Sequence, residues 1–130
     1  MASADDDYKP FAFIYGEMVS VIQCADVVLS RAGANSLSEC AVCAKPMVLV
    51  PLCGSGTRGD QVDNAEYFRS RGGAVVLAGE DANDEKLLAE LDRLSAAENR
   101  KALSDSLRDI TGQNRPVKNI ADLVIKECGL

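Results

Sequence analysis

Short runs of apolar residues alternate along this chain with stretches in which apolar residues recur every three or four positions. The continuous runs are rich in Val and Leu, as in strands that are buried on both faces, and they lie at residues 26–30, 47–51 and 74–77. Recurrence at every third or fourth position is the period of an amphipathic helix, and it predicts helices over residues 17–24, 36–44, 60–71 and 87–94. A fourth apolar run, at residues 11–15, fits either a strand or an ordered loop.

Capping residues mark where several of these elements begin and end. Gly72-Gly73 is expected to end the helix before it as a C-cap, and residues 53–59 form a loop rich in Gly and Ser. The sequence from Ser95 to Glu98 has the form of a capping box that opens a further helix. Pro116 is expected at the start of a last helix, because proline is favoured in the first turn.

The order strand, helix, strand, helix, strand, helix predicts an α/β fold, because parallel strands are joined by helical crossovers. Three strands are expected, or four if residues 11–15 form one. A typical sheet has about five or six strands. The sequence therefore predicts part of a doubly wound, Rossmann-like sheet, with a strand of the buried type left at an edge.

Length and composition narrow the classes of function. The chain has 130 residues, enough for one core, and its 14 Lys and Arg against 20 Asp and Glu give a net charge of −6. An acidic chain without a basic cluster is a poor candidate for binding nucleic acid or an anionic membrane. No apolar run approaches the roughly 20 residues that span a bilayer. Residues 1–10 are expected to form a polar leader and not a signal peptide.

The chain contains no histidine and five cysteines. The absence of histidine excludes Ser-His-Asp and Cys-His catalysis and zinc sites with His ligands. An odd number of cysteines without a signal peptide indicates free thiols in a reducing compartment. Cys40 and Cys43 form a Cys-x-x-Cys pair inside a predicted helix, where the helix N-terminus cannot lower a thiol pKa. We therefore interpret Cys40 as a core residue, and no metal site is predicted.

The first candidate site is the turn between the strand at 26–30 and the next helix. In open α/β sheets, ligands bind at the carboxyl ends of strands, and free N–H groups at a helix start favour an anion such as a diphosphate. Gly33 lets the backbone approach the ligand, Glu39 could accept bonds from ribose hydroxyls, and Arg31 could meet a phosphate or pair with an acid. In the alternative interpretation Gly33 is only a turn residue, and Ser36 and Glu39 form a capping box.

The second candidate site follows the next strand and faces the same edge of the sheet. Asp60, Gln61 and Asn64 fall in the first turns of a helix, where they could bond sugar hydroxyls and an amide. The alternative is that Asp60 is an N-cap and Gln61 is solvated. Two neighbouring strand ends that both carry polar loops favour a shared binding site.

Two stretches of the sequence resemble a known family. The segments ADVVLSRAGANSLSECAVCAKPMVLVPL and RGDQVDNAEYFRSRGGAVVL resemble the C-terminal, donor-binding domain of the MurG-like N-acetylglucosaminyltransferases, which belong to glycosyltransferase family 28 and have the GT-B fold. The resemblance runs from about Phe11 to the C-terminus. It implies that residues 11–130 are the distal part of a GT-B donor-binding domain, a C-terminal half-domain.

The resemblance also implies a ligand and the residues that hold it. The donor substrate would be UDP-N-acetylglucosamine, with no further cofactor. Ile14 matches the segment that holds uracil, Glu39 the ribose-binding glutamate, and Asn64 an asparagine behind the sugar site. Gly33, Ala34 and Asn35 match the turn whose amides face the donor. Ser36 matches a small hydroxyl residue near the sugar, and Asp60 and Gln61 match a polar pair that contacts the sugar.

The family's acceptor-binding domain and the first half of its donor domain have no counterpart in this sequence. The leading hypothesis is therefore a UDP-N-acetylglucosamine-binding portion of a transferase that acts on a lipid-linked peptidoglycan intermediate, without a catalytic residue of its own. Its partner would be the missing N-terminal half. The chain is expected in the cytoplasm, and its association with the inner membrane face would be made only through that half. One alternative is a catalytic subunit that needs a separate acceptor-binding protein. The other is a non-enzymatic remnant that serves as an interaction module.

Overall fold

The computed structural model describes residues 7–54 and 59–113. Its strands are β1 (Val28–Ser30), β2 (Met47–Leu49) and β3 (Ala74–Val76), which form one sheet in the order β1-β2-β3. Both pairings are parallel, and Val28 lies opposite Met47, which lies opposite Ala74. The predicted α/β class with parallel strands is confirmed. Each strand is only three residues long, shorter than the apolar run that predicted it.

Five α-helices and one 3-10 turn surround the sheet within the described residues. The α-helices are α1 (Met18–Cys24), α2 (Ala34–Val42), α3 (Asp60–Ser70), α4 (Asp84–Arg93) and α5 (Ala97–Gln113), and the 3-10 turn η1 (Gly79–Asp81) precedes α4. All five helices were predicted, four from apolar periodicity and α5 from the capping pattern at residues 95–98, whereas η1 was not. The predicted helix after Pro116 lies outside the described residues. None of the helices in the described part is long and apolar enough to cross a membrane.

The sheet separates two apolar clusters. Met47 and Leu49 of β2 point into the larger cluster, where they pack with residues of α2, α3 and α5 such as Leu37, Ala65 and Leu107. Val48 points to the opposite face and packs with Leu77 and Leu94. The three residues of β2 are fully buried, since side chains of a strand alternate between the two faces and both faces are covered at the centre of the sheet.

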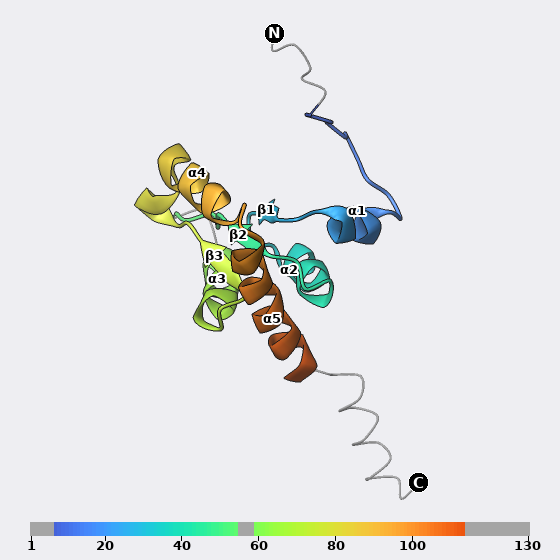
Figure 1. Cartoon of the computed structure of the whole chain (residues 1–130). Coiled ribbons are helices and arrows are strands. Elements are labelled where there is room, and N and C mark those ends of the chain that lie inside the picture. Colours follow the sequence, from blue (N-terminus) through green and yellow to red (C-terminus); the bar gives the residue numbers. More distant parts are fainter. Residues whose placement is uncertain (1–6, 55–58, 114–130) are drawn as a thin grey trace, which may run out of the picture.

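The N-terminal part of the described chain extends away from this body. Residues 11–15 form no strand, so the sheet has three strands in the described residues and the fourth, optional strand is absent there. Figure 1 shows this segment running from α1 away from the sheet. Its aromatic side chains are exposed, Phe13 by 77% and Tyr15 by 81%, and their rings stack at 6.1 Å.

Helix starts differ from prediction at two places. α2 begins at Ala34 with Gly33 as its N-cap, so Ser36 lies inside the first turn and the capping box of Ser36 and Glu39 is wrong. α5 begins at Ala97, which makes Ala96 the residue before the first turn and contradicts a capping box at Ser95. The predicted C-cap at Gly72-Gly73 is confirmed. Gly72 is left-handed, with φ 73°, and Gly73 N–H donates to Phe68 C=O at 2.9 Å.

Candidate functional site

The two polar loops follow β1 and β2 and lie at the carboxyl edge of the sheet. β1 ends at Ser30, and three residues lead from it to α2; β2 ends at Leu49, and the longer loop after it leads to α3. Because β1 and β2 are parallel, both loops emerge at the same edge. The structure thus brings the first turn of α2 and the first turn of α3 to one edge, as the sequence predicted.

The first turn of α2 offers backbone donors. The first intrahelical bond runs from Leu37 N–H to Gly33 C=O at 3.0 Å, so the N–H groups of Ala34, Asn35 and Ser36 precede the helical hydrogen-bond ladder. No side chain caps this end. Three N–H groups and the positive end of the helix dipole are therefore directed at the carboxyl edge, an arrangement that suits an anion.

Gly33 leaves the approach to these donors open. A Cβ placed on Gly33 would meet no heavy atom within 4 Å. Its φ of −66° is also accessible to any residue. Neither backbone conformation nor packing within the described chain therefore requires glycine at this position. A side chain at position 33 would instead occupy the open space above the turn.

The residue before Gly33 is held in a strained conformation. Ala32 is fully buried and has φ 67°, in the left-handed region that residues with a Cβ rarely adopt. Its carbonyl accepts a hydrogen bond from Asn64 Nδ2 of α3 at 3.4 Å. Asn64 therefore lies behind the turn and braces it, so it does not point its amide nitrogen at the edge where a ligand would sit.

Gln61 braces the second loop in a similar way. Its Oε1 accepts a hydrogen bond from Leu52 N–H, just after β2, at 3.0 Å. Gly59, with φ 77°, is the N-cap of α3. Asp60 is the first residue of the helix, and its side chain is exposed. The alternative in which Asp60 caps the helix and Gln61 is merely solvated is therefore wrong. Gln61 fixes the loop, and its Nε2 is the group that can still donate.

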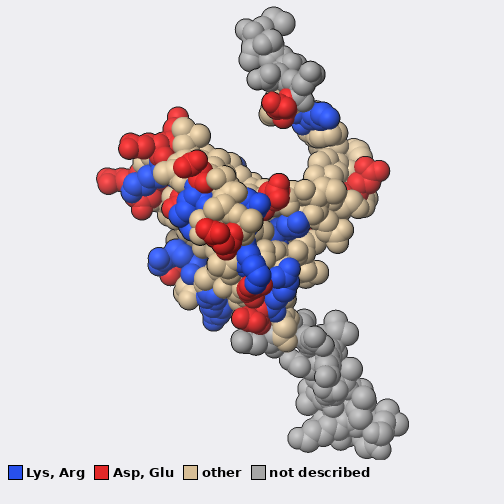
Figure 2. All heavy atoms as spheres, in the orientation of Figure 1, with Lys and Arg blue, Asp and Glu red and all other residues tan. Residues whose placement is uncertain are grey.

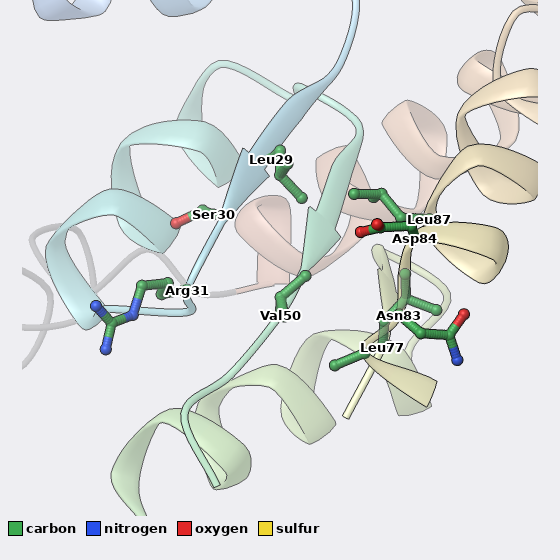
Figure 3. Close-up of a pocket in the computed structure, with 9 residues that line it drawn as sticks. Leu29, Ser30, Arg31, Val50, Leu77, Asn83, Asp84 and Leu87 are labelled. Carbon is green, nitrogen blue, oxygen red and sulfur yellow. The ribbon is translucent and has the colours of Figure 1, made fainter. Parts of the chain in front are cut away.

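Glu39 and Arg31 flank the first turn of α2 and are both exposed. Glu39 lies on α2 beside a small apolar hollow that Val19 of α1 and Val42 also line. The guanidinium of Arg31 extends away from the sheet in Figure 3, and within the described residues no carboxylate forms an ion pair with it. Both side chains are thus available to a ligand at this edge.

Ile14 is the predicted site residue that the structure does not bring to the others. It lies in the extended segment before α1 and lines a separate hollow with Phe11, Phe13 and Val21. α1, which follows that segment, contacts α2 and buries Ile22 in the larger apolar cluster. The turn residues of α2 and α3 therefore form one group, and Ile14 stands apart from it.

A further hollow, this one at the carboxyl edge of the sheet, was not predicted from the sequence. It has a volume of about 360 Å³ and lies on the face of the sheet that α4 covers. Figure 3 shows Leu29, Val50 and Leu87 converging on it from β1, the end of β2 and α4. The only sequence signal was that these positions are apolar, and apolar residues in such runs are ordinarily assigned to the core.

The titratable groups with displaced pKa values lie outside the candidate site. Burial raises the pKa of the Cys40 thiol, with Cys43 and Glu39 adding to the effect. Hydrogen bonds from Arg69 and Lys101 lower the pKa of Glu66 and Asp105 respectively. The described residues contain no cluster of side chains suited to a metal ion. The edge thus offers donors, a carboxylate and amides for holding a ligand, without a group tuned for proton transfer.

Fold and loops together define a class: an α/β domain with parallel strands and polar loops at their carboxyl ends, where open α/β sheets generally bind ligands. Within that class, the model of the glycosyltransferase family 28 C-terminal domain matches residues 1–124, and the chain belongs to this family. Membership confirms the predicted resemblance. It also confirms the predicted fold, a partial Rossmann-like sheet of the GT-B C-terminal type.

Three curated relatives carry the name UDP-N-acetylglucosamine--N-acetylmuramyl-(pentapeptide) pyrophosphoryl-undecaprenol N-acetylglucosamine transferase. The relative from Treponema denticola is 39% identical over 125 residues, which cover 92% of this chain and 32% of the relative. That from Treponema pallidum (strain Nichols) is 44% identical over 87 residues, 67% of this chain and 23% of the relative. Transferase 2 from Bacillus cereus is 37% identical and matches 83% of this chain and 30% of its own length. The chain spans about a third or less of the relatives it matches.

A solved structure shares the fold. It is described as the glycotransferase of kitacinnamycin, and it superposes with a TM-score of 0.62 at 23% sequence identity. The match covers 83% of this chain and 27% of that one. At this identity the similarity shows the arrangement of strands and helices and nothing about the ligand.

Proposed function

We propose that this chain is the UDP-N-acetylglucosamine-binding portion of a family 28 transferase that delivers N-acetylglucosamine to a lipid-linked peptidoglycan intermediate. The observation that carries the proposal is the uncapped start of α2, which directs the N–H groups of Ala34, Asn35 and Ser36 at the carboxyl edge of the sheet. The names of the relatives supply the donor and the acceptor.

In this proposal the diphosphate lies against the first turn of α2. When the acceptor hydroxyl attacks the anomeric carbon, the bond from that carbon to the diphosphate breaks and negative charge grows on the leaving UDP. The amides of α2 are already oriented toward that charge and stabilise it without rearrangement. Arg31 adds a positive charge beside them.

The other predicted site residues position the donor. Glu39 accepts hydrogen bonds from the ribose hydroxyls, Asp60 and the Nε2 of Gln61 bond the sugar, and the backbone of Ile14 contacts the uracil. Asn64 acts from behind by holding the carbonyl of Ala32. Positioning of this kind places the anomeric carbon for attack and accounts for the absence of a proton-transfer group.

The remainder of the reaction depends on polypeptide beyond this chain, either the N-terminal half of one protein or a partner subunit. The acceptor site and the group that takes the proton from the acceptor would lie there. We place the intact enzyme in the cytoplasm, at the inner face of the membrane, with the membrane contact made by the acceptor-binding part.

Calorimetric titration with UDP and with UDP-N-acetylglucosamine tests the proposal. Replacement of Glu39 by Ala should weaken binding of both ligands by at least about tenfold, because hydrogen bonds to a charged group contribute about 1.5–3 kcal/mol. Glu98→Ala is the matched control, since Glu98 is an exposed residue of the first turn of α5 and its loss should leave affinity within about twofold. Unchanged affinity in Glu39→Ala would falsify the assigned site.

A further inference from the structure

A hollow at the amino edge of the sheet gathers basic side chains that lie far apart in the sequence. It has a volume of about 360 Å³ and lies between the segments that lead into β1 and β2 and one face of α5. Lys45 comes from the segment before β2, whereas Arg100, Lys101 and Arg108 come from α5. Folding thus creates a basic cluster that is not visible in the sequence, and we call this place the basic hollow.

The basic hollow lies at the end of the sheet opposite the candidate donor site. Asp26 precedes β1 and Lys45 precedes β2, whereas the first turns of α2 and α3 follow the ends of these strands. Three residues of a strand span about 10 Å. A small ligand in the basic hollow is therefore separate from one that the first turn of α2 holds.

The positive charge of the basic hollow is only partly compensated. Lys101 Nζ and Arg108 Nη1 share a single carboxylate, that of Asp105, at 2.5 and 2.9 Å. Lys45 is half-buried, and no carboxylate of the described residues forms an ion pair with it. Its ammonium group is therefore available to an anion that enters the hollow.

Arg100 is held in place at this hollow before any ligand binds. Its Nη1 donates to the carbonyls of Leu94 and Ser95 at 2.8 and 2.7 Å, and its side chain is only 25% exposed. Its Nε lies 3.9 Å from the carboxylate of Asp26, which is 85% exposed, and so loose a pair at the surface contributes little. Among the described residues nothing accepts a hydrogen bond from its Nη2, which can donate to a ligand.

An anion with more than one charge suits this arrangement. The four cations face two carboxylates, Asp26 and Asp105, which leaves an excess of two positive charges in a chain of net charge −6. Figure 2 shows Lys and Arg side chains gathered over α5, whereas acidic side chains gather over η1 and the start of α4. A concave surface with an excess of one charge concentrates ions of the opposite sign, and the planar donors of arginine match the oxygens of a phosphate group.

The lining of the basic hollow favours a dissolved ligand over a lipid headgroup. Its uncharged part includes small residues such as Ala25, Ala44 and Ala97. None of the large, exposed apolar side chains of the described chain belongs to it. Attachment to a membrane surface generally combines basic charge with apolar side chains that enter the acyl region, and this second component is missing from the hollow as the structure describes it.

We propose that the basic hollow is a second anion site of this chain, which binds a soluble ligand that carries a diphosphate or another multivalent phosphate group. Oxygens of the ligand accept hydrogen bonds from Lys45 Nζ and Arg100 Nη2, and Lys101 and Arg108 add positive charge. The ligand joins the segment before β2 to α5, so its binding stabilises the folded chain. This site lies outside the proposed function and does not depend on it.

An amide chemical-shift titration with inorganic pyrophosphate at constant ionic strength tests the location. Changes are expected at Lys45, Arg100 and Lys101, and they should persist in Gly33→Ala, which alters the separate turn before α2. Changes around the basic hollow support this site whether or not the amides of α2 respond. Changes confined to α2, or changes spread evenly over the exposed Lys and Arg residues, overturn the proposal.

Substitutions test the role of the individual charges. Lys45→Gln should weaken pyrophosphate binding in the basic hollow by at least about fivefold, because a charged donor to phosphate is lost. Lys101→Gln should also weaken it, without altering the segment before β2. Lys86→Gln is the matched control, since it removes the same charge from α4, where Lys86 pairs with Asp81, and should leave affinity within about twofold. Equal weakening in Lys45→Gln and Lys86→Gln would show general attraction by charge and overturn the proposal.

Two other ligands distinguish the source of the anion. The chain should not sediment with vesicles of phosphatidylglycerol and phosphatidylcholine; sedimentation that Lys45→Gln abolishes would make a lipid headgroup the ligand and contradict a soluble one. A peptide of ten glutamates should change the amide shifts of the basic hollow less than pyrophosphate does. Larger changes with the peptide would make an acidic polypeptide the ligand and overturn the proposal.

Discussion

Ala32 is the residue at which the candidate site departs furthest from ordinary backbone geometry. Its left-handed φ of 67° costs roughly 1–2 kcal/mol relative to a right-handed conformation. Full burial and the hydrogen bond from Asn64 hold it there. Strained residues of this kind concentrate at functional sites, where surrounding structure over-determines them. The strain fixes the direction in which Gly33 and the first turn of α2 face the edge.

Substitution of Gly33 by Ala separates stability from binding. The free energy of unfolding should fall by about 1 kcal/mol, because alanine is a poorer N-cap than glycine, with no further loss from a clash, since the site has open space. Affinity for UDP should fall about tenfold, since the new Cβ occupies the space through which the diphosphate approaches. Calorimetry and urea unfolding measure the two quantities.

Gly112→Ala is the control for this change, because a Cβ there also meets nothing within 4 Å and Gly112 lies in α5. It should leave UDP affinity unaltered. If Gly33→Ala also leaves affinity unaltered, the ligand does not approach α2 across this turn.

Cys40 gives the stability of the chain a dependence on pH. Burial raises its pKa above the ordinary 9.0, so the folded chain keeps the thiol proton where the unfolded chain has lost it. The contribution of this group to stability is full below about pH 9 and is lost as pH rises through the folded pKa. Urea unfolding between about pH 8 and about pH 10 should therefore show a smaller loss of stability in Cys40→Ala than in the parent. An equal loss in both would show that Cys40 does not carry this dependence.

At the scale of elements, α2 ends in a motif that normally contains glycine. Ala44 N–H donates to Ala41 C=O at 2.9 Å, and Lys45 N–H donates to Cys40 C=O at 2.9 Å. These two bonds form a Schellman motif, in which the residue after the C-cap is left-handed. That residue is Ala44, with φ 51°.

Ala44→Gly should therefore stabilise the chain by about 0.5–1 kcal/mol, because glycine adopts this conformation without the Cβ clash. Ala89→Gly is the matched control. Ala89 is exposed inside α4, where the same change should destabilise by about 1 kcal/mol. Denaturant unfolding measures both, and changes of the same sign would contradict the assignment of the motif.

Elements were predictable from the sequence because apolar runs and apolar periodicity report directly on burial. Their ends were not. The pair Ser36 and Glu39 has the pattern of a capping box, yet the sharp turn at Ala32 starts α2 two residues earlier, at Ala34. The turn depends on burial of Ala32 against α2 and α3 and on Asn64, which is 32 positions away in the chain. Local patterns cannot contain such a long-range contact.

At the scale of the whole molecule, the shared position of the two polar loops followed from parallel topology and was predicted. The bracing role of Gln61 was not, because its partner Leu52 N–H is identified only once the loop has a conformation. The hollow beside β1 was not predicted either. Leu29 and Val50 look like core residues in the sequence, and only the described structure shows that one face of the sheet is incompletely covered.

The chain alone should bind the donor without transferring the sugar. No histidine is present, and the displaced pKa values among the described residues lie away from the carboxyl edge. Transfer of labelled N-acetylglucosamine to a lipid-linked acceptor should stay at the level of a protein-free control. Turnover by the chain alone would contradict the assignment of proton transfer to polypeptide beyond it.

The most direct test of the central claim, that a nucleotide sugar binds where α2 and α3 begin, is an amide chemical-shift titration of the chain with UDP-N-acetylglucosamine. The largest changes are expected at Ala34, Asn35 and Ser36, where N–H groups would bond the diphosphate. Smaller changes are expected at Gln61. The claim would be contradicted if the amides of α2 showed no change. It would also be contradicted if the largest changes fell at Leu29 and Leu87, which line the hollow on the face of the sheet that α4 covers.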